Sequence, residues 1–417
     1  MRTFMSTTRR SSIAVAGIVA AAALTCRAPA TRVVESTVSG GFVVTLGNDT
    51  MSAESYTRVG NRIEGAVMRR VPRTVVVRYT MTLSATGLPS RLDYTTRLAD
   101  GAMLPGGARS VAVTFTGDSA LTEIVRDSVI TTRVAASNAY PDLDGSVLMY
   151  GLPIAALREM SRDSARFVAY LPGAPSGDRT PVVRRDPNTY WLYSDVNPIA
   201  LETDDDGLLL AVDATRTTFR VRSRRQAPVD VAALATDFAR REAIAGPVTA
   251  LSPRDTVQAM IGGVQFWVDY SRPAARGRRI FGLDGVLGDT LWRTGANRST
   301  QFRADAAISF AGQTLPAGTY ALMTLAVPGR YQLIFYEGAI ERLRVPLEAT
   351  ALAPPVERFT IAIDAAGERS GIIRLRWDTM ELSAPFNLSA SPAMARGAWR
   401  GAPAGTSQGA RQRQAGR

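Results

Sequence analysis

Short runs of alternating apolar and polar residues, separated by turn residues, dominate the first part of the chain. This period-2 pattern is typical of antiparallel β-strands. The breaks contain Gly47-Asn48-Asp49, Gly60-Asn61 and Val71-Pro72, which favour tight turns. We therefore expect an antiparallel meander with strands at residues 42–46, 54–59, 62–68, 74–83, 91–97, 110–116 and 121–134.

The pattern changes after Tyr140. Residues 146–160 place apolar side chains at helical spacing and predict one or two short helices. Strands are expected again at 166–171, 189–193, 208–212 and 218–224. Asp230 is expected to cap a helix that runs to about Ala243, with Val231, Leu234 and Phe238 on one side.

A second β-rich unit is predicted from Asp255 onwards, after a boundary at residues 246–254. Gly262-Gly263 separates two alternating runs and predicts a tight hairpin. Residues Val264, Phe266, Val268 and Tyr270 would then share one face. Further strands are expected at 299–302, 319–326, 331–336, 357–363 and 370–378.

These patterns predict a mainly β protein with two antiparallel domains. The first, residues 38–245, would be a meander or half-open barrel with short helices. By pattern alone it is similar to the half-open barrels of periplasmic lipid-binding proteins. The second, residues 255–386, would be β-sandwich-like.

Residues 1–30 have the pattern of an export signal. Arg2, Arg9 and Arg10 precede an apolar run at 13–24, which is too short to span a bilayer as a helix. Cys26, the single cysteine, stands where a bacterial lipoprotein carries its acylated residue, whereas Ala28-Pro29-Ala30 suits ordinary cleavage. We therefore expect either a periplasmic or outer-membrane lipoprotein or a secreted protein.

The formal net charge of +12 is concentrated at the two ends of the chain. Four arginines in residues 1–30 and five in residues 388–417 account for nine of these charges, because neither segment contains an acidic residue. The body is near neutral, so nucleic-acid binding is not expected. Residues 387–417 are expected to form a disordered, Arg-rich tail that offers a second route to membrane anchoring.

Two residue types are absent from the chain, and this limits the reactions that it could catalyse. The chain contains no His and no Lys, so its 49 basic residues are all Arg. Imidazole-activated nucleophiles, His-ligated metals, Schiff bases and a phosphate-binding P-loop lysine are therefore excluded. No cofactor is expected.

The segment from about residue 256 to 386 resembles the bacterial family called domain of unknown function 2911. The resemblance is carried by several phrases in a fixed order: Tyr-Ser-Arg-Pro at 270–273, Gly-Arg-Arg-Ile-Phe-Gly at 277–282, Trp-Arg-Thr-Gly-Ala-Asn at 292–297, Leu-Pro-Ala-Gly-Thr-Tyr at 315–320, Val-Glu-Arg-Phe-Thr-Ile at 356–361 and Leu-Arg-Trp at 375–377. It implies an exported β-rich domain and no established activity.

Within these phrases, Arg272, Arg293 and Asn297 are candidate ligand-binding residues. Arginine can grip a carboxylate, phosphate or sugar hydroxyl with two donors, and Asn can donate and accept beside it. Tyr270 and Trp292 would form an apolar wall. Alternatively, these residues belong to turns, with the guanidiniums tied to backbone carbonyls or to Asp269 and Asp289.

Acidic clusters give two further alternatives. Asp204-Asp205-Asp206-Gly207 could bind Ca²⁺ through oxygen ligands or could form a hairpin turn. Asp142 and Asp144 before Gly145 present the same choice. For Leu315-Pro316-Ala317-Gly318-Thr319 we expect a β-turn that leads into a strand.

These observations favour a non-catalytic envelope protein that binds or scaffolds a small, lipid-like or cell-wall ligand. The alternative is a hydrolase or carbohydrate-active enzyme that uses two carboxylates, since that chemistry needs neither His nor Lys. The oligomeric state is left open.

Overall fold

The computed structural model describes residues 36–193, 198–217, 220–288 and 291–389. The predictions for the export signal, Cys26, Asp289 and the tail beyond Ser389 lie outside these residues. No helix within the described ranges is long and apolar enough to cross a membrane.

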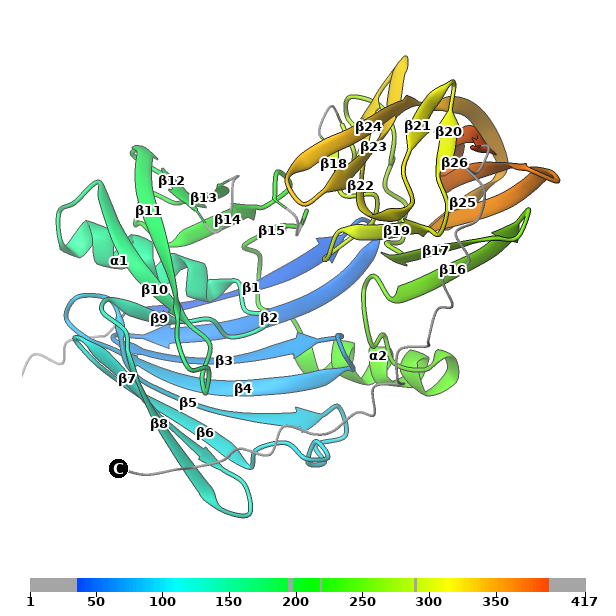
Figure 1. The fold of residues 1–417 in the computed structure, drawn as a ribbon. Helices are drawn as coiled ribbons and strands as arrows, with labels where there is room; N and C mark the ends of the chain where they lie inside the picture. Colours follow the sequence, from blue (N-terminus) through cyan, green and yellow to red (C-terminus); the bar gives the residue numbers. More distant parts are fainter. Residues whose placement is uncertain (1–35, 194–197, 218–219, 289–290, 390–417) are drawn as a thin grey trace, which may run out of the picture. The chain divides into compact units, whose positions relative to one another are not determined.

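The first half of the chain forms one fifteen-stranded sheet (Figure 1). Eight consecutive strands form an antiparallel meander, as the alternating pattern predicts: β1 (Thr37–Leu46), β2 (Asp49–Val59), β3 (Arg62–Arg69), β4 (Val75–Leu83), β5 (Pro89–Leu98), β6 (Ser110–Thr116), β7 (Ser119–Val125) and β8 (Val129–Ala135). The other seven continue the sheet from β1: β15 (Arg222–Arg224), β14 (Leu209–Asp213), β13 (Ile199–Thr203), β12 (Thr189–Leu192), β11 (Asp178–Asp186), β10 (Ser164–Tyr170) and β9 (Ala139–Pro141).

The two faces of this sheet differ in character. The inner face carries Phe42, Tyr56, Ile63, Tyr79 and Leu92, which belong to one large buried core. The outer face is mostly polar. It has a small apolar patch on β2, β3 and β4, made of Ala53, Met68 and Val76. This division follows from the period-2 alternation of each strand.

Two helical segments cover the two faces. The 3₁₀ helix η1 (Leu148–Gly151) and helix α1 (Leu152–Glu159) connect the parallel strands β9 and β10, and they pack into the inner core. Helix α2 (Val231–Ala245) lies against the outer patch (Figure 1). Asp230 accepts a hydrogen bond from the Ala233 backbone N–H at 2.9 Å, which confirms the predicted cap.

One predicted strand is wrong. Residues 121–134 form two strands, β7 and β8, that fold back on each other around Arg126, Asp127 and Ser128. The turn contains neither Gly nor Pro, so its sequence gives little warning of the reversal. The alternating pattern also does not predict strands β9, β11 and β13.

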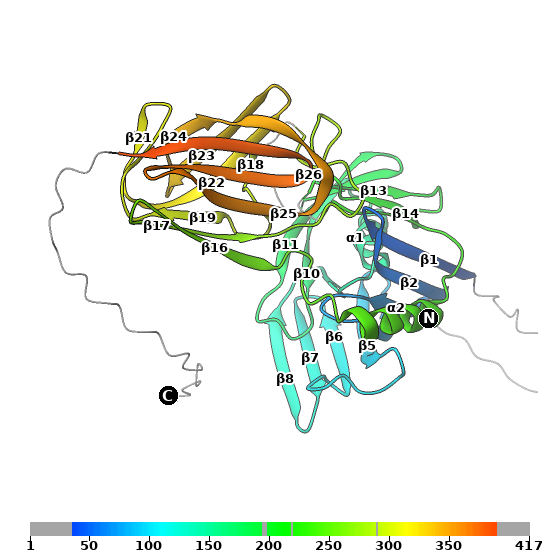
Figure 2. The same cartoon turned by 90° about the vertical axis from the view of Figure 1, so that its right-hand side faces the viewer.

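The remaining strands form two antiparallel sheets. The first, of seven strands, contains β16 (Arg254–Ile261), β17 (Val264–Ser271), β19 (Thr300–Ala304), β22 (Gly318–Val327), β23 (Arg330–Glu337) and β24 (Ile340–Pro346), with β18 (Leu291–Trp292) paired to β22. The second contains β21 (Gln313–Leu315), β20 (Ile308–Phe310), β26 (Ser370–Leu388) and β25 (Glu348–Gly367). Figure 2 shows β25 and β26 running side by side as a long hairpin.

Side chains from both sheets form a single core that includes Phe266, Phe302, Phe335 and Phe386. The predicted Gly262-Gly263 hairpin is confirmed, because Ile261 pairs with Val264 and both glycines have positive φ. Among the residues that the structure describes, none of the sheets is closed, and the predicted mainly β class with antiparallel sheets is confirmed.

Candidate functional site

The Tyr-Ser-Arg-Pro phrase joins the two C-terminal sheets. Tyr270 is buried on β17, and its hydroxyl accepts a hydrogen bond from the Ile361 backbone N–H on β25 at 3.1 Å. Beyond the strand, the Phe359 N–H donates to the Pro273 carbonyl, and the Ala275 N–H donates to the Glu357 carbonyl. The phrase therefore links the end of β17 to one edge of β25.

Arg272 completes this link. Its guanidinium pairs with Asp255 at 3.0 Å and donates to the Phe359 carbonyl at 3.2 Å and to the Thr360 hydroxyl at 2.9 Å. The carboxylate partner is Asp255 and not the expected Asp269, which pairs with Arg254. The Arg272 guanidinium therefore has three partners on two sheets and helps to hold these sheets together.

The Trp-Arg-Thr-Gly-Ala-Asn phrase forms the connection between β18 and β19. The Trp292 indole N–H donates to the Gly295 carbonyl at 2.7 Å, and its ring packs edge-on against Phe359 and stacks with Trp377. Arg293 is exposed, and its guanidinium donates to the Asn297 carbonyl. Trp292 is thus part of the aromatic core, and Arg293 and Asn297 belong to a turn.

The five sequence-predicted ligand residues fall into two groups. Tyr270, Arg272 and Trp292 all contact Phe359 or its neighbours on β25, whereas Arg293 and Asn297 contact each other. Tyr270 and Trp292 make aromatic contacts with Phe359, and Trp292 also stacks with Trp377. None of the five lines the groove described below, so their ligand role stays a prediction.

The acidic clusters form turns. Asp204 to Leu208 connects β13 to β14, with the Gly207 N–H bonded to the Asp204 carbonyl and the Leu208 N–H bonded to its carboxylate. Leu143 and Ser146 are joined by a backbone hydrogen bond across Asp144 and Gly145. Across the described ranges, no group of three or more His, Cys, Asp or Glu side chains is placed to hold a metal ion.

A groove with a volume of about 730 Å³ crosses the outer face of the N-terminal sheet. It runs over β2 to β6, which corresponds to about 19 Å at the usual strand spacing. Its wall includes residues Val229 to Ala232 at the start of α2. The groove is open and elongated, so it suits an extended ligand.

Two rows of outward-facing residues line the groove. The first row is Ser55, Ala66, Arg78 and Thr95 in register, followed by Ser110 on β6. The second is Thr57, Glu64, Thr80, Asp93 and Ala112. The floor therefore consists of small residues and hydroxyls, with one cation and two carboxylates.

The polar groups of the groove differ in how they are engaged. Glu64 pairs with Arg62 at 2.9 Å and Asp93 pairs with Arg91 at 2.7 Å, both at exposed positions. In contrast, Arg78 is exposed and makes no hydrogen bond or ion pair with any residue that the structure describes. The hydroxyls of Ser55, Thr80, Thr95 and Ser110 are equally without a partner among the described residues. These groups remain available to a ligand.

A buried carboxylate lies on the opposite face. Glu54 on β2 is fully buried and accepts hydrogen bonds from the Tyr79 hydroxyl at 2.9 Å, the Ser146 hydroxyl at 2.5 Å and the backbone N–H groups of Val147 and Leu148 at 2.7 and 2.9 Å. Burial raises the pKa of Glu54, and these hydrogen bonds offset part of the rise. Glu54 thus fastens the start of η1 to the sheet.

The sequence pattern did not reveal either feature. Outward polar residues on β2 to β6 are what alternation predicts for any solvated sheet face, so the groove has no distinct signature. Glu54 did leave a signal, because it shares the parity of Tyr56 and therefore had to face the core.

The fold and the contacts of Tyr270, Arg272 and Trp292 define a mainly β protein in which the phrases at 270–273 and 292–297 link the two C-terminal sheets. Residues 252–386 match the family model described as protein of unknown function (DUF2911). This match confirms the resemblance predicted from the sequence.

No match to a curated protein was found. Among solved structures, the crystal structure of a DUF1089 family protein from Pseudomonas aeruginosa is similar, with a TM-score of 0.31 and 15% sequence identity. The match covers 40% of this chain and 90% of that chain. A similarity of this size carries no argument about function.

Proposed function

We propose that the chain is an exported cell-envelope protein that binds an extended polar ligand, such as a cell-wall fragment, without catalysing a reaction. The observation that supports this most is the groove on the outer face, where Arg78 and four hydroxyls have no partner among the described residues. Export rests on the pattern of residues 1–30 alone.

The chemistry of the groove favours a ligand with hydroxyl or amide groups and one anionic group. A guanidinium binds carboxylate or phosphate oxygens with paired donors, and Ser and Thr hydroxyls can donate or accept. A lipid tail is less suitable, since the groove floor is polar. The apolar inner face is already covered by the protein's own residues, including Ile154 and Leu157 of α1.

The test is binding of soluble fragments from enzymatically digested peptidoglycan, measured by isothermal titration calorimetry. We expect Arg78→Gln to weaken binding by about 10-fold or more, because a hydrogen bond to a charged group contributes about 1.5–3 kcal/mol. Arg162→Gln removes the same charge at an exposed position outside the groove and should leave affinity unchanged. Equal losses in both variants, or no binding by the parent, would reject the proposal.

A second candidate function is carboxylate-dependent hydrolysis. It is favoured by Glu64 and Asp93, which line the groove on the same face two strands apart, or about 10 Å between Cα atoms. One carboxyl of such a pair must hold a proton, a state that an apolar site promotes. Both residues are instead exposed and paired with arginine. The test is release of reducing ends from the same digest. If the parent releases them and Glu64→Gln or Asp93→Asn does not, the protein is a hydrolase and the non-catalytic proposal is wrong.

A further inference from the structure

Strand β8 is one of the two edges of the fifteen-stranded sheet. It pairs with β7 on one side and has no strand partner on the other within the described residues. Its first two residues, Val129 and Ile130, are 62% and 47% exposed. An edge of this kind presents a row of unpaired N–H and C=O groups to any strand that matches it.

This edge lacks the protection found at another edge strand, β24 of the seven-stranded sheet. Strand β24 carries Glu341, Arg342, Arg344 and Pro346, and its pairing with β23 contains a register shift. Charges, proline and bulges all discourage strand addition. In contrast, β8 contains one charged residue, Arg133, whose guanidinium donates back to Ser119 on β7 at 3.0 Å. The β7–β8 pairing has no register shift.

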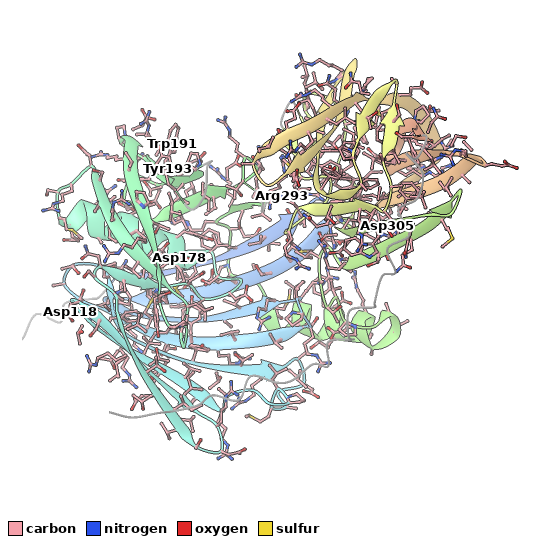
Figure 3. All side chains as sticks on the ribbon, viewed as in Figure 1. Asp118, Asp178, Trp191, Tyr193, Arg293 and Asp305 are labelled. Carbon is pink, nitrogen blue, oxygen red and sulfur yellow. The ribbon has the colours of Figure 1, made fainter. Side chains whose placement is uncertain are left out.

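The hydrogen bonds around β7 show which backbone groups of β8 are free. The Val125 carbonyl accepts from Arg109, towards β6, so its partner Val129 points its own groups away from β7. At the other end, the Ala136 N–H donates to the carbonyl of Asp118, which lies before β7 (Figure 3). Because backbone groups alternate along a strand, the groups that point to the open side are those of Val129, Thr131, Arg133 and Ala135.

We propose that β8 pairs antiparallel with β8 of a second copy of the chain, about a two-fold axis at Thr132. In this register Thr131 exchanges hydrogen bonds with Arg133 of the other copy, and Val129 does so with Ala135. All four outward-pointing residues then have partners. Thr132 faces Thr132 in a non-hydrogen-bonded position, where threonine pairs are favourable.

The side chains support a second copy as the occupant. No like charges face each other, because each Arg133 lies opposite a threonine. Ile130 lies opposite Val134, which is buried in the inner core, so the apolar inner face continues across the axis. One pair of short strands buries less than a standard interface, so we expect a dimer that dissociates on dilution.

The register is tested by cysteine cross-linking of the full chain carrying Cys26→Ser. Cα atoms of a non-hydrogen-bonded pair are about 4.5 Å apart, within the range that a disulfide spans. Thr132→Cys should therefore yield a disulfide-linked dimer under mild oxidation. Thr131→Cys is the matched control, because its two copies are offset by about 7 Å along the strands. We expect at least a 10-fold higher yield for Thr132→Cys.

Sedimentation velocity of the parent chain provides the second readout, with a monomer–dimer shift expected between low and high micromolar concentration. Thr131→Pro removes an N–H that points to the open edge and should abolish this shift while leaving the pairing with β7 intact. A monomer at every concentration, or equal cross-linking at positions 131 and 132, would overturn the proposal. A dimer that survives Thr131→Pro with an unchanged dissociation constant would do so too.

Discussion

Tyr79 on β4 donates a hydrogen bond of 2.9 Å to the buried carboxylate of Glu54 on β2, although β3 lies between the two strands. Gly65 makes this possible. A Cβ atom at Gly65 would lie 2.4 Å from the Tyr79 hydroxyl oxygen, so the tyrosine ring crosses β3 where that strand has no side chain. A glycine on one strand therefore sets the hydrogen-bond partner of a residue on another.

Gly65→Ala should displace the Tyr79 ring and break its bond to Glu54. We expect a loss of about 2–4 kcal/mol in the free energy of unfolding, from overpacking plus a buried Tyr79 hydroxyl that is left without its acceptor. Urea denaturation measures the change. Gly117→Ala is the control, because a Cβ there would meet nothing within 4 Å. Similar midpoints for the two variants would show that the ring has another place to lie.

Replacing Glu54 by Leu should destabilise the protein more than replacing it by Gln. Leucine leaves the N–H groups of Val147 and Leu148 without their acceptor, at a cost of about 3–5 kcal/mol. Glutamine keeps one acceptor oxygen and can donate to the Tyr79 and Ser146 hydroxyls. Hydrogen exchange of η1 should report the difference, with faster exchange in Glu54→Leu. Equal exchange rates in both variants would show that Glu54 does not anchor η1.

The stability difference between Glu54→Gln and the parent should depend on pH. Because the pKa of Glu54 is raised in the folded state, the folded parent holds its proton to higher pH than the unfolded chain. The contribution of Glu54 to stability is therefore fully present at pH values below its ordinary pKa of 4.5. This contribution is lost as the pH rises through the pKa of the folded state.

Glu54→Gln should therefore gain stability relative to the parent as pH rises above 4.5 and level off beyond the folded pKa. Urea denaturation of both proteins between pH 4 and pH 8 checks this. A constant difference across the range would contradict a raised pKa.

Arg272→Met should weaken the junction between the two C-terminal sheets. It removes contacts to Asp255, the Phe359 carbonyl and Thr360 together, for which we expect a loss of about 2–3 kcal/mol. Arg303→Met is the comparison, since the Arg303–Asp305 pair is exposed and should contribute less than about 1 kcal/mol. Hydrogen exchange along β25 would show the local effect. Unchanged exchange there would show that Arg272 does not stabilise the junction with β25.

Local signals in the sequence predicted the elements well where one residue type determines the geometry. Gly262-Gly263 predicted the β16–β17 hairpin and Asp230 the start of α2, because each acts through its own backbone. The turn at Arg126 to Ser128 was missed, since none of its residues is restricted to a turn. The pairing of β1 with β15 could not be inferred, because it joins residues far apart in the chain.

The site was less predictable than the fold. Family phrases pointed to Arg272 and Trp292, but a phrase does not reveal that a guanidinium already has three partners within the fold. Arg78 belongs to no phrase and resembles any solvated arginine. Its availability depends on the absence of an acidic residue opposite it on β3 and β5, which only the register shows.

The pairing of β1 with β15 also constrains the order in which the protein can form. Strands β2 to β8 each join a neighbour that immediately precedes them, so this part of the sheet can grow as the chain emerges. β1 gains its second neighbour only when Arg222 is available to pair with Thr45. Until then β1 is an edge as open as β8. A nascent chain thus exposes two strand edges with unpaired backbone groups. One of them, β1, is covered only after synthesis has reached residue 222.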